Sequence, residues 1–217
     1  MTVDTENGII IGVNCYPANR RESDIILKHV RRQMEETGLT IGSIALDGGY
    51  DVGAVHRGFE LMGITDYCSI REMHNNALRK GFEYDQNTDC FICEKGKRLI
   101  FSKLIFKQKQ RYYRIYRLLR RECKGCPRLA HCSMDKDSIC INASPFYPAY
   151  YANRLRCQTS AYKEMKRLRS IWSEGTFAAL KNGNMLSRHR KRGIQRAAEE
   201  CLLSALALNL KRMAKAA

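Results

Sequence analysis

The first 37 residues combine a turn signal with two kinds of apolar pattern. Polar and glycine residues at 6–8 precede the apolar run 9–13, an arrangement that predicts a hairpin over residues 1–17. Ile26, Val30 and Met34 then recur every four residues, which predicts a helix over 22–37. The chain therefore opens with a hairpin and an amphipathic helix.

A short apolar run, 43–46, follows and ends at Asp47, Gly48 and Gly49. Its length and its turn residues predict a buried strand with a tight turn after it. Apolar residues at helical spacing predict a second helix from about 51 to 62. The order hairpin, helix, strand, helix indicates an α/β fold with a partly parallel sheet.

The pattern breaks between residues 71 and 153, where Cys, Tyr, Lys and Arg are frequent and periodicity is weak. We interpret 71–153 as an insertion into a core formed by 1–70 and 154–217. Helical periodicity returns over 162–181 and again over 194–214. The apolar stripe of the last helix comprises Ala198, Leu202, Ala205, Leu208 and Met213.

Composition places the chain among globular proteins. With 217 residues and 44% hydrophobic content, it can bury a core. No apolar run reaches the length of a membrane span, so no membrane partner is expected. The first residues include Asp4 and Glu6, where a signal peptide would carry basic residues. These features predict a cytoplasmic protein.

Positive charge is concentrated in the later part of the chain. Of 38 basic and 22 acidic residues, 6 basic and 10 acidic lie in 1–70, which leaves 32 and 12 for 71–217. Basic side chains that meet phosphates release condensed counterions, so a polyanion such as DNA is the favoured partner. A generally basic protein without a nucleic-acid ligand is the alternative from composition alone.

Two acidic residues stand at positions where carboxylates carry chemistry. Asp47 ends a buried strand, where open α/β sheets present ligands, although such an Asp also commonly caps a turn. Glu174 and Lys181 are seven residues apart, two helical turns, and so share a face. A carboxylate and a lysine so aligned can hold a metal and a phosphate. An ordinary solvated helix face is the other interpretation.

Several separated segments together resemble bacterial insertion-sequence transposases of the DDE class. They are residues 45–51, 174–177 with Lys181, 192–194 and 207–213. The resemblance is to the branch with a cysteine-bearing insertion before the catalytic Glu. It implies a ribonuclease H-like mixed sheet with flanking helices, Mg²⁺ or Mn²⁺ as cofactor, and cleavage and joining of transposon ends. The implied partners are double-stranded DNA, as terminal inverted repeats and target, and a second copy in a homodimer.

The resemblance assigns Asp47 as the second acidic metal ligand, Glu174 as the third and Lys181 to the catalytic site. Two divalent ions held by carboxylates suit in-line phosphoryl displacement. The first Asp of the family comes from a strand before the hairpin, whereas Asp4 matches a hairpin residue by position. The chain therefore resembles a truncated form that lacks the first catalytic Asp and is expected to be inactive alone.

A second departure precedes the catalytic Glu. Arg167 and Ser170 stand where many relatives have Tyr and Arg, and the neighbouring Arg169 is a substitute for the missing Arg.

The ten cysteines include two groups with metal-ligand spacing. Cys90 and Cys93 form a C-x₂-C pair, and Cys123, Cys126 and Cys132 form a C-x₂-C-x₅-C group. In a reducing cytosol this spacing indicates a structural Zn²⁺ site. The resemblance selects Cys93, Cys123, Cys126 and Cys132, with Cys90 as a competing ligand and Cys140 as a spare. Buried thiols without a metal are the alternative, and they are our interpretation of Cys15, Cys68, Cys157 and Cys201.

Basic residues interleaved with tyrosines lie between the two cysteine groups, and a second basic cluster follows the Glu174 helix. Basic side chains of this kind can bind phosphates while the aromatic rings stack, although a run of charged residues usually forms a solvent-exposed face. The expected DNA-binding residues are Lys103, Lys107, Lys109, Arg111, Arg114, Arg117, Arg188, Arg190 and Arg192.

Three functions follow from these patterns. The first is a DDE transposase acting in the nucleoid, with metal-dependent DNA strand cleavage and transfer in its complete form. The second is a non-catalytic, zinc-stabilised DNA-binding protein or transposition inhibitor. The third is a stand-alone nuclease on the same fold. An acidic strand encoded upstream of residue 1 would favour the first over the second.

Overall fold

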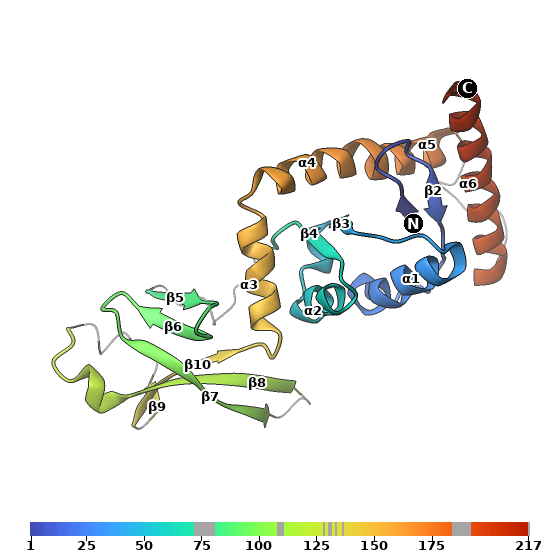
Figure 1. The fold of residues 1–217 in the computed structure, drawn as a ribbon. Helices are drawn as coiled ribbons and strands as arrows, with labels where there is room; N and C mark the ends of the chain where they lie inside the picture. The colour runs from blue at the N-terminus through green and yellow to red at the C-terminus, as the bar shows by residue number, and fades with distance from the viewer. Residues whose placement is uncertain are drawn as a thin grey trace.

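The fold divides into two parts that helix α3 connects (Figure 1). One part contains the short strands β1 to β4 with helices α1, α2 and α4 to α6. The other is a curved antiparallel sheet, β5 to β10. The computed structural model describes residues 1–71, 81–107, 111–127, 129, 132, 134–135, 137–183 and 192–216. The chain is therefore α/β, as the sequence predicts.

The first part contains two small sheets. Strands β1 (Thr2–Val3) and β2 (Ile10–Gly12) pair antiparallel, and β3 (Ser43–Leu46) and β4 (Thr65–Cys68) pair parallel. Within the described residues these pairs are separate sheets, so the expected single mixed sheet is not formed. Each of these four short strands hydrogen-bonds to one partner strand, and no strand in the described part of the chain joins the two pairs.

Two helices cover these strands. Helix α1 spans Glu22–Thr37 and ends at Gly38, which has a left-handed φ of 70° and donates its N–H to Met34. Helix α2 spans Gly53–Leu61 after a 3₁₀ turn at Gly48–Tyr50. The predicted helix positions are confirmed to within two residues. The core between them consists of Ile26, Val30, Leu46, Val55, Phe59, Ile64 and Cys68.

The region without clear periodicity forms a six-stranded antiparallel sheet. Its strand order is β5-β6-β7-β8-β10-β9. The strands are β5 (Phe82–Asp85), β6 (Cys90–Cys93), β7 (Arg98–Lys107), β8 (Arg111–Leu119), β9 (Met134–Asp135) and β10 (Ser138–Ala143). The sequence did not predict this sheet, because β7 carries apolar residues toward solvent on both faces: Ile100 is 63% exposed and Phe101 41%. Period-two alternation is weak where neither face is fully buried.

Aromatic packing joins this sheet to helix α3 (Tyr147–Arg156). Tyr84, Phe91, Tyr116 and Tyr147 are buried, and their rings meet mostly edge to face at centroid distances of 4.9 to 6.2 Å. Helix α3 was not predicted, since its first residues fall in the range interpreted as insertion. Its remaining contacts are with α2 and β4 of the first part.

The expected helix over 162–181 consists of three pieces. Helix α4 spans Ser160–Arg169, a π turn spans Ser170–Glu174, and α5 spans Gly175–Gly183. The last helix, α6, spans Ile194–Ala216. No helix in the described part of the chain is both long and apolar enough to cross a membrane.

Helix α6 buries only part of the apolar stripe that the sequence predicts for it. Ala205 is buried against Ile10 and Leu180, with Leu208 beside them. Leu202 and Met213 are instead 53% and 59% exposed. Apolar residues occupy more than one face of this helix, so the apolar pattern alone did not identify the buried face.

Candidate active site

Asp47 occupies the turn at the carboxyl end of β3. Its backbone is extended and its Oδ1 accepts the Gly49 N–H at 2.8 Å, so one oxygen caps the turn. The other oxygen, Oδ2, lies 3.6 Å from the Arg169 guanidinium. The carboxylate is about half exposed. Asp47 therefore has both the capping role and an outward-facing oxygen.

Strand β4 and helix α3 stabilise the turn of Asp47 through hydrogen bonds. The Cys68 thiol donates to the Asp47 carbonyl at 3.0 Å. The Asn153 side chain accepts from the Cys68 N–H and donates to the Cys68 carbonyl, so it pairs with the backbone of β4 as a neighbouring strand would. Burial raises the pKa of the Cys68 thiol, and nearby carboxylates raise it further. Cys68 is a neutral structural donor.

Glu174 lies at the end of the π turn and meets the same guanidinium as Asp47. Arg169 Nη1 donates to Glu174 Oε1 at 2.9 Å, and Ser170 Oγ donates to Glu174 Oε2 at 3.2 Å. The two predicted carboxylates are 127 positions apart in the sequence, yet one arginine contacts both. Lys181 lies exposed on α5, seven residues beyond Glu174.

The π turn explains how Arg169 reaches Glu174. A π turn accommodates one more residue than an α-helical turn, and such turns are frequent at functional sites. Residues five apart, Arg169 and Glu174, consequently face each other. Ser170, four residues before Glu174, contributes a hydroxyl from the adjacent position. The π turn thus places an arginine beside Glu174 although the sequence has serine at the expected position.

Trp172, in the middle of the π turn, packs on the hairpin. A side chain at Gly8 would begin 2.2 Å from the indole ring, and Gly8 has a φ of 70°, so only glycine fits. The Arg212 guanidinium lies 5.8 Å from the indole centroid, donates to the Gly8 carbonyl and donates to Thr176 at 2.7 Å. Helix α6 and the hairpin therefore fix the segment that carries Glu174.

A third carboxylate, Glu22 at the start of α1, lies near Asp47. Asp47 Oδ1 and Glu22 Oε2 are 3.0 and 3.4 Å from the position a Gly49 side chain would take. Burial raises the pKa of Tyr50 to about 12, and the charges of Glu22 and Asp47 add to the effect while Arg169 opposes it. Glu22 was not predicted from the sequence as a site residue, because the first turn of any helix favours acidic residues for the helix dipole.

A buried ionic network lies directly behind the site. His56 Nδ1 is 2.5 Å from Asp66 Oδ2 and His56 Nε2 is 3.0 Å from Asp51 Oδ1, with all three side chains at most 1% exposed. A ring whose two nitrogens both face carboxylate oxygens is favoured as the imidazolium, in which both nitrogens donate. Arg156 from α3 also pairs with Asp66, and the Arg71 N–H donates to Asp51.

The effects on the His56 pKa oppose one another. Burial lowers it, but the hydrogen bonds and charges of Asp51 and Asp66 outweigh burial and raise it. This network was not predicted from the sequence. Its one visible signal is an aspartate, Asp66, in the middle of a short strand whose last residue, Cys68, is buried.

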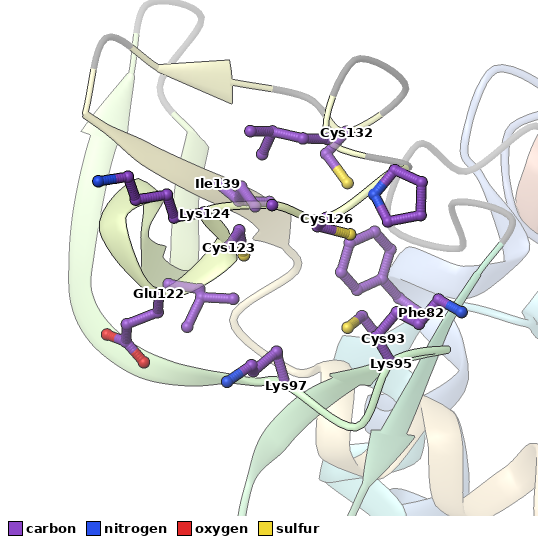
Figure 2. A pocket seen from close by; sticks show the side chains of 14 residues that line it. Phe82, Cys93, Lys95, Lys97, Glu122, Cys123, Lys124, Cys126, Cys132 and Ile139 are labelled. Atoms are coloured by element: carbon purple, nitrogen blue, oxygen red, sulfur yellow. The ribbon is translucent and has the colours of Figure 1, made fainter.

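The four predicted zinc ligands line one pocket of about 230 Å³. Figure 2 shows Cys93 at the end of β6 and Cys123, Cys126 and Cys132 on the segment after β8, with their sulfur atoms toward a common space. Cys90, the competing ligand, is buried in β6 and does not line this pocket. Burial raises the pKa of the Cys123 thiol, and the other three sulfurs raise it further.

Neither set of predicted ligands forms a closed metal-binding arrangement. Across the residues that the structure describes, no three His, Cys, Asp or Glu side chains are grouped as metal ligands. The carboxylate pair is separated by a guanidinium, and the thiols surround an open pocket.

The predicted DNA-binding residues are placed unevenly. Lys103 is exposed on β7 and Arg192 is exposed before α6. Arg114 instead pairs with Asp89 and lies 4.4 Å from the centroid of the Phe101 ring, and Arg117 is partly buried in β8. Lys107 and Arg111 end β7 and begin β8, where only the backbone is described; Lys109, Arg188 and Arg190 lie outside the described residues.

A family model described as "Transposase DDE domain" matches residues 92–214, which is more than half of the chain. The chain belongs to this transposase family. The match includes Glu174, Lys181 and the cysteines from 93 onward, whereas Asp47 precedes it. No curated protein and no solved structure matches the chain.

Proposed function

We propose that this protein is an insertion-sequence transposase whose complete form cleaves and joins DNA at transposon ends with divalent metal ions. The observation that carries this proposal is the Arg169 guanidinium, which contacts both Asp47 and Glu174. Two carboxylates from distant segments thus converge on one cation. A site for divalent ions and a phosphate likewise needs carboxylates from distant segments brought close together.

The donor set fits Mg²⁺ or Mn²⁺. Mg²⁺ prefers oxygen ligands and is commonly bound through one or two carboxylates together with substrate phosphates. When bound, the ions would stabilise the attacking and leaving oxygens of phosphoryl transfer. Asp47 and Glu174 would hold them, and Arg169 and Lys181 would then be free to contact the DNA phosphate.

We also propose that Asp4 does not serve as the first catalytic Asp of the family. Two features support this: β1-β2 and β3-β4 are separate two-stranded sheets, and Asp4 is occupied in the hairpin turn. Asp4 Oδ2 accepts the backbone N–H groups of Glu6 and Asn7. Its position in the turn is consistent with a hairpin residue and not with a metal ligand.

A transposition inhibitor is the second candidate, and it is favoured because no third carboxylate is grouped with Asp47 and Glu174 among the described residues. Such a protein would bind transposon-end DNA without cutting it. A longer version that supplies an acidic strand before residue 1 separates the two candidates. Mg²⁺-dependent cleavage by the longer version, absent from the 217-residue chain, supports the transposase; a longer version that binds and never cleaves supports the inhibitor.

Metal binding at the carboxylate pair can be measured through Trp172, which is the single tryptophan of the chain and lies two residues from Glu174. We expect Mn²⁺ to quench its fluorescence in a saturable titration. Asp47→Asn and Glu174→Gln should each weaken Mn²⁺ binding by roughly tenfold or more, because each removes a charged oxygen ligand.

Glu164→Gln is the matched control for this titration. Glu164 is an exposed carboxylate on α4 that already pairs with Arg167. This variant should bind Mn²⁺ as the wild type does. Equal Mn²⁺ affinity in all four proteins would contradict a metal site at Asp47 and Glu174.

We propose that the thiol pocket is a structural zinc site, with Cys93, Cys123, Cys126 and Cys132 as ligands. Four sulfurs are the donor set that tetrahedral Zn²⁺ prefers in structural sites. The pocket joins the end of β6 to the segment that precedes β9. Zinc would therefore tie the end of β6 to the segment between β8 and β9.

We propose that duplex DNA contacts the basic surface after residue 71, including Lys103 on β7 and Arg192 before α6. Each phosphate contact adds a logarithmic salt slope of roughly −0.9, so binding should weaken steeply with salt. Lys103→Ala should lower both the affinity and the slope in a salt titration. Arg114→Ala should change the slope less, because Arg114 already pairs with Asp89. Affinity that hardly varies with salt would refute the proposal.

A further inference from the structure

Two cysteines from distant segments of the chain meet beside helix α6. Cys15 lies between β2 and α1, and Cys201 lies on α6, 186 positions later. Their sulfur atoms are 3.5 Å apart, within hydrogen-bond distance for thiols, and both side chains are half-buried. A disulfide bond brings two sulfur atoms to about 2.0 Å, so a movement of roughly 1.5 Å would close one here. The fold therefore places two free thiols where they can react with each other and with a small molecule from solvent.

Thiols elsewhere in the chain, outside the thiol pocket, face oxygen atoms instead of sulfur. Their partners are backbone carbonyls or hydroxyl groups, and this arrangement holds for Cys68, Cys90, Cys140 and Cys157. An oxygen partner cannot form an S–S bond. The contact between Cys15 and Cys201 therefore differs in chemistry from the contacts of these four thiols.

The contacts around the two thiols keep α6 beside the β1-β2 hairpin. Ala205 is buried against Ile10, and the Asn209 side chain accepts from the Ile10 N–H and donates to the Ile10 carbonyl. Figure 1 shows α6 alongside β2. Cys201 is four residues, about one helical turn, before Ala205. A disulfide can therefore form without separating the two elements.

The surroundings of Cys201 keep its thiol protonated. Burial, together with the hydrogen bond and the charge of Cys15, raises the pKa of the Cys201 thiol to about 11. Because the thiolate is the reactive form of cysteine, the first step of an oxidation falls to Cys15. The Cys201 thiol is in position to donate a hydrogen bond to the Cys15 thiolate.

We propose that Cys15 and Cys201 form a reversible redox site, at which hydrogen peroxide oxidises the two thiols to a disulfide that ties the segment before α1 to α6. The Cys15 sulfur attacks one peroxide oxygen, the O–O bond breaks, and water leaves a sulfenic acid on Cys15. The Cys201 sulfur then attacks the Cys15 sulfur, so an S–S bond forms, the S–O bond breaks and a second water leaves. The two thiols together lose two electrons and two protons, and one peroxide becomes two waters. A dithiol reductant reverses the reaction by thiol–disulfide exchange.

Peptide mapping after oxidation tests the pairing. The full chain is treated with graded amounts of hydrogen peroxide, its remaining thiols are alkylated, and trypsin cleavage after Arg20, Arg196 and Lys211 isolates the two cysteines on separate peptides. We expect the peptide that ends at Arg20 to be linked to peptide 197–211, with a combined mass lower by two hydrogen atoms. A dithiol reductant should separate the two peptides. Alkylated Cys15 in protein whose other thiols are oxidised, or a disulfide from Cys15 to any other cysteine, a second copy included, would overturn the proposal.

Three variants check the assignment. Cys15→Ser and Cys201→Ser should each abolish the linked peptides. Cys140→Ser is the matched control, because Cys140 is also half-buried but contacts the Ser138 hydroxyl. This control should form the disulfide as the wild type does, and loss of the linked peptides from it would contradict a site made of Cys15 and Cys201 alone.

Thermal unfolding measures what the disulfide does to the fold. Arg212 of α6 donates to Thr176, two residues after Glu174, so a disulfide on α6 adds a second attachment to a helix that supports this segment. The disulfide also closes a loop of 186 positions, so oxidised wild type should melt several degrees above oxidised Cys15→Ser. Both proteins carry the same cysteines in the thiol pocket, and a dithiol reductant should remove most of the difference. Equal melting temperatures after oxidation would show that the disulfide does not tie α6 to the hairpin.

Discussion

Replacing His56 with leucine is expected to lower the free energy of unfolding by about 3–5 kcal/mol. The substitution leaves the buried carboxylates of Asp51 and Asp66 without their shared donor, and uncompensated buried charge is costly. Arg156 still pairs with Asp66 in the variant, so the uncompensated charge of Asp51 causes most of the loss of stability. Urea denaturation of the wild type and the variant measures the difference.

The His56 contribution should depend on pH in a defined direction. Its folded-state pKa is raised above the ordinary value of 6.5, so the imidazolium stabilises the fold fully below pH 6.5. That stabilisation is lost as the pH rises through the folded-state pKa. The difference between the wild type and His56→Leu should therefore shrink toward alkaline pH.

Arg57→Ala is the control on the same helix. Arg57 pairs with Glu60 at the surface, where both side chains are substantially exposed, so its loss should change stability by less than about 1 kcal/mol. If His56→Leu proved as stable as Arg57→Ala at pH 6, the imidazolium would not be a principal support of the turn that carries Asp47.

Freshly reduced protein is expected to contain about one zinc ion per chain. Cys123→Ser and Cys126→Ser should lose it, and chelation should destabilise the six-stranded sheet by several kcal/mol, on the order of what structural zinc contributes to small domains. Metal analysis and thermal unfolding measure the two effects. The expected loss is large because the pocket joins the end of β6 to the segment that follows β8.

Two cysteines serve as controls for the zinc experiment. Cys90→Ser introduces a hydroxyl at a buried position of β6, and Cys140→Ser introduces one at a partly buried position of β10. Neither residue lines the thiol pocket. Both variants should keep zinc. Zinc-free wild-type protein, or loss of zinc from the Cys90 variant alone, would contradict the proposed ligands.

The positions of Asp47 and Glu174 depend on residues that have no DNA chemistry of their own. Asn153 and Cys68 hold the turn of Asp47, while Trp172 and Arg212 hold the segment of Glu174. Substitutions at these supports should therefore affect the site indirectly, through geometry. The small β1-β2 hairpin is part of this support because Gly8 packs directly on the indole ring.

The sequence by itself determined the elements whose patterns are local. Helix α1, strand β3 and helix α6 lie within two residues of their predicted bounds, because helical spacing and turn residues act over a few neighbours. The segments around Asp47 and Glu174 were also recognisable, since each motif is continuous in the chain. These signals were sufficient to predict the family to which the chain belongs.

Only the tertiary structure decided the rest. Strand pairing in the six-stranded sheet joins residues from different segments, and it buries Leu99 while leaving the equally apolar Ile100 exposed. The π turn changes which residue faces Glu174, so Arg169 and not Ser170 bridges to Asp47. The pairing of His56 with Asp66, and the choice of the inner face of α6, likewise depend on what each element packs against. Sequence patterns report local periodicity, whereas these features arise from contacts between distant segments.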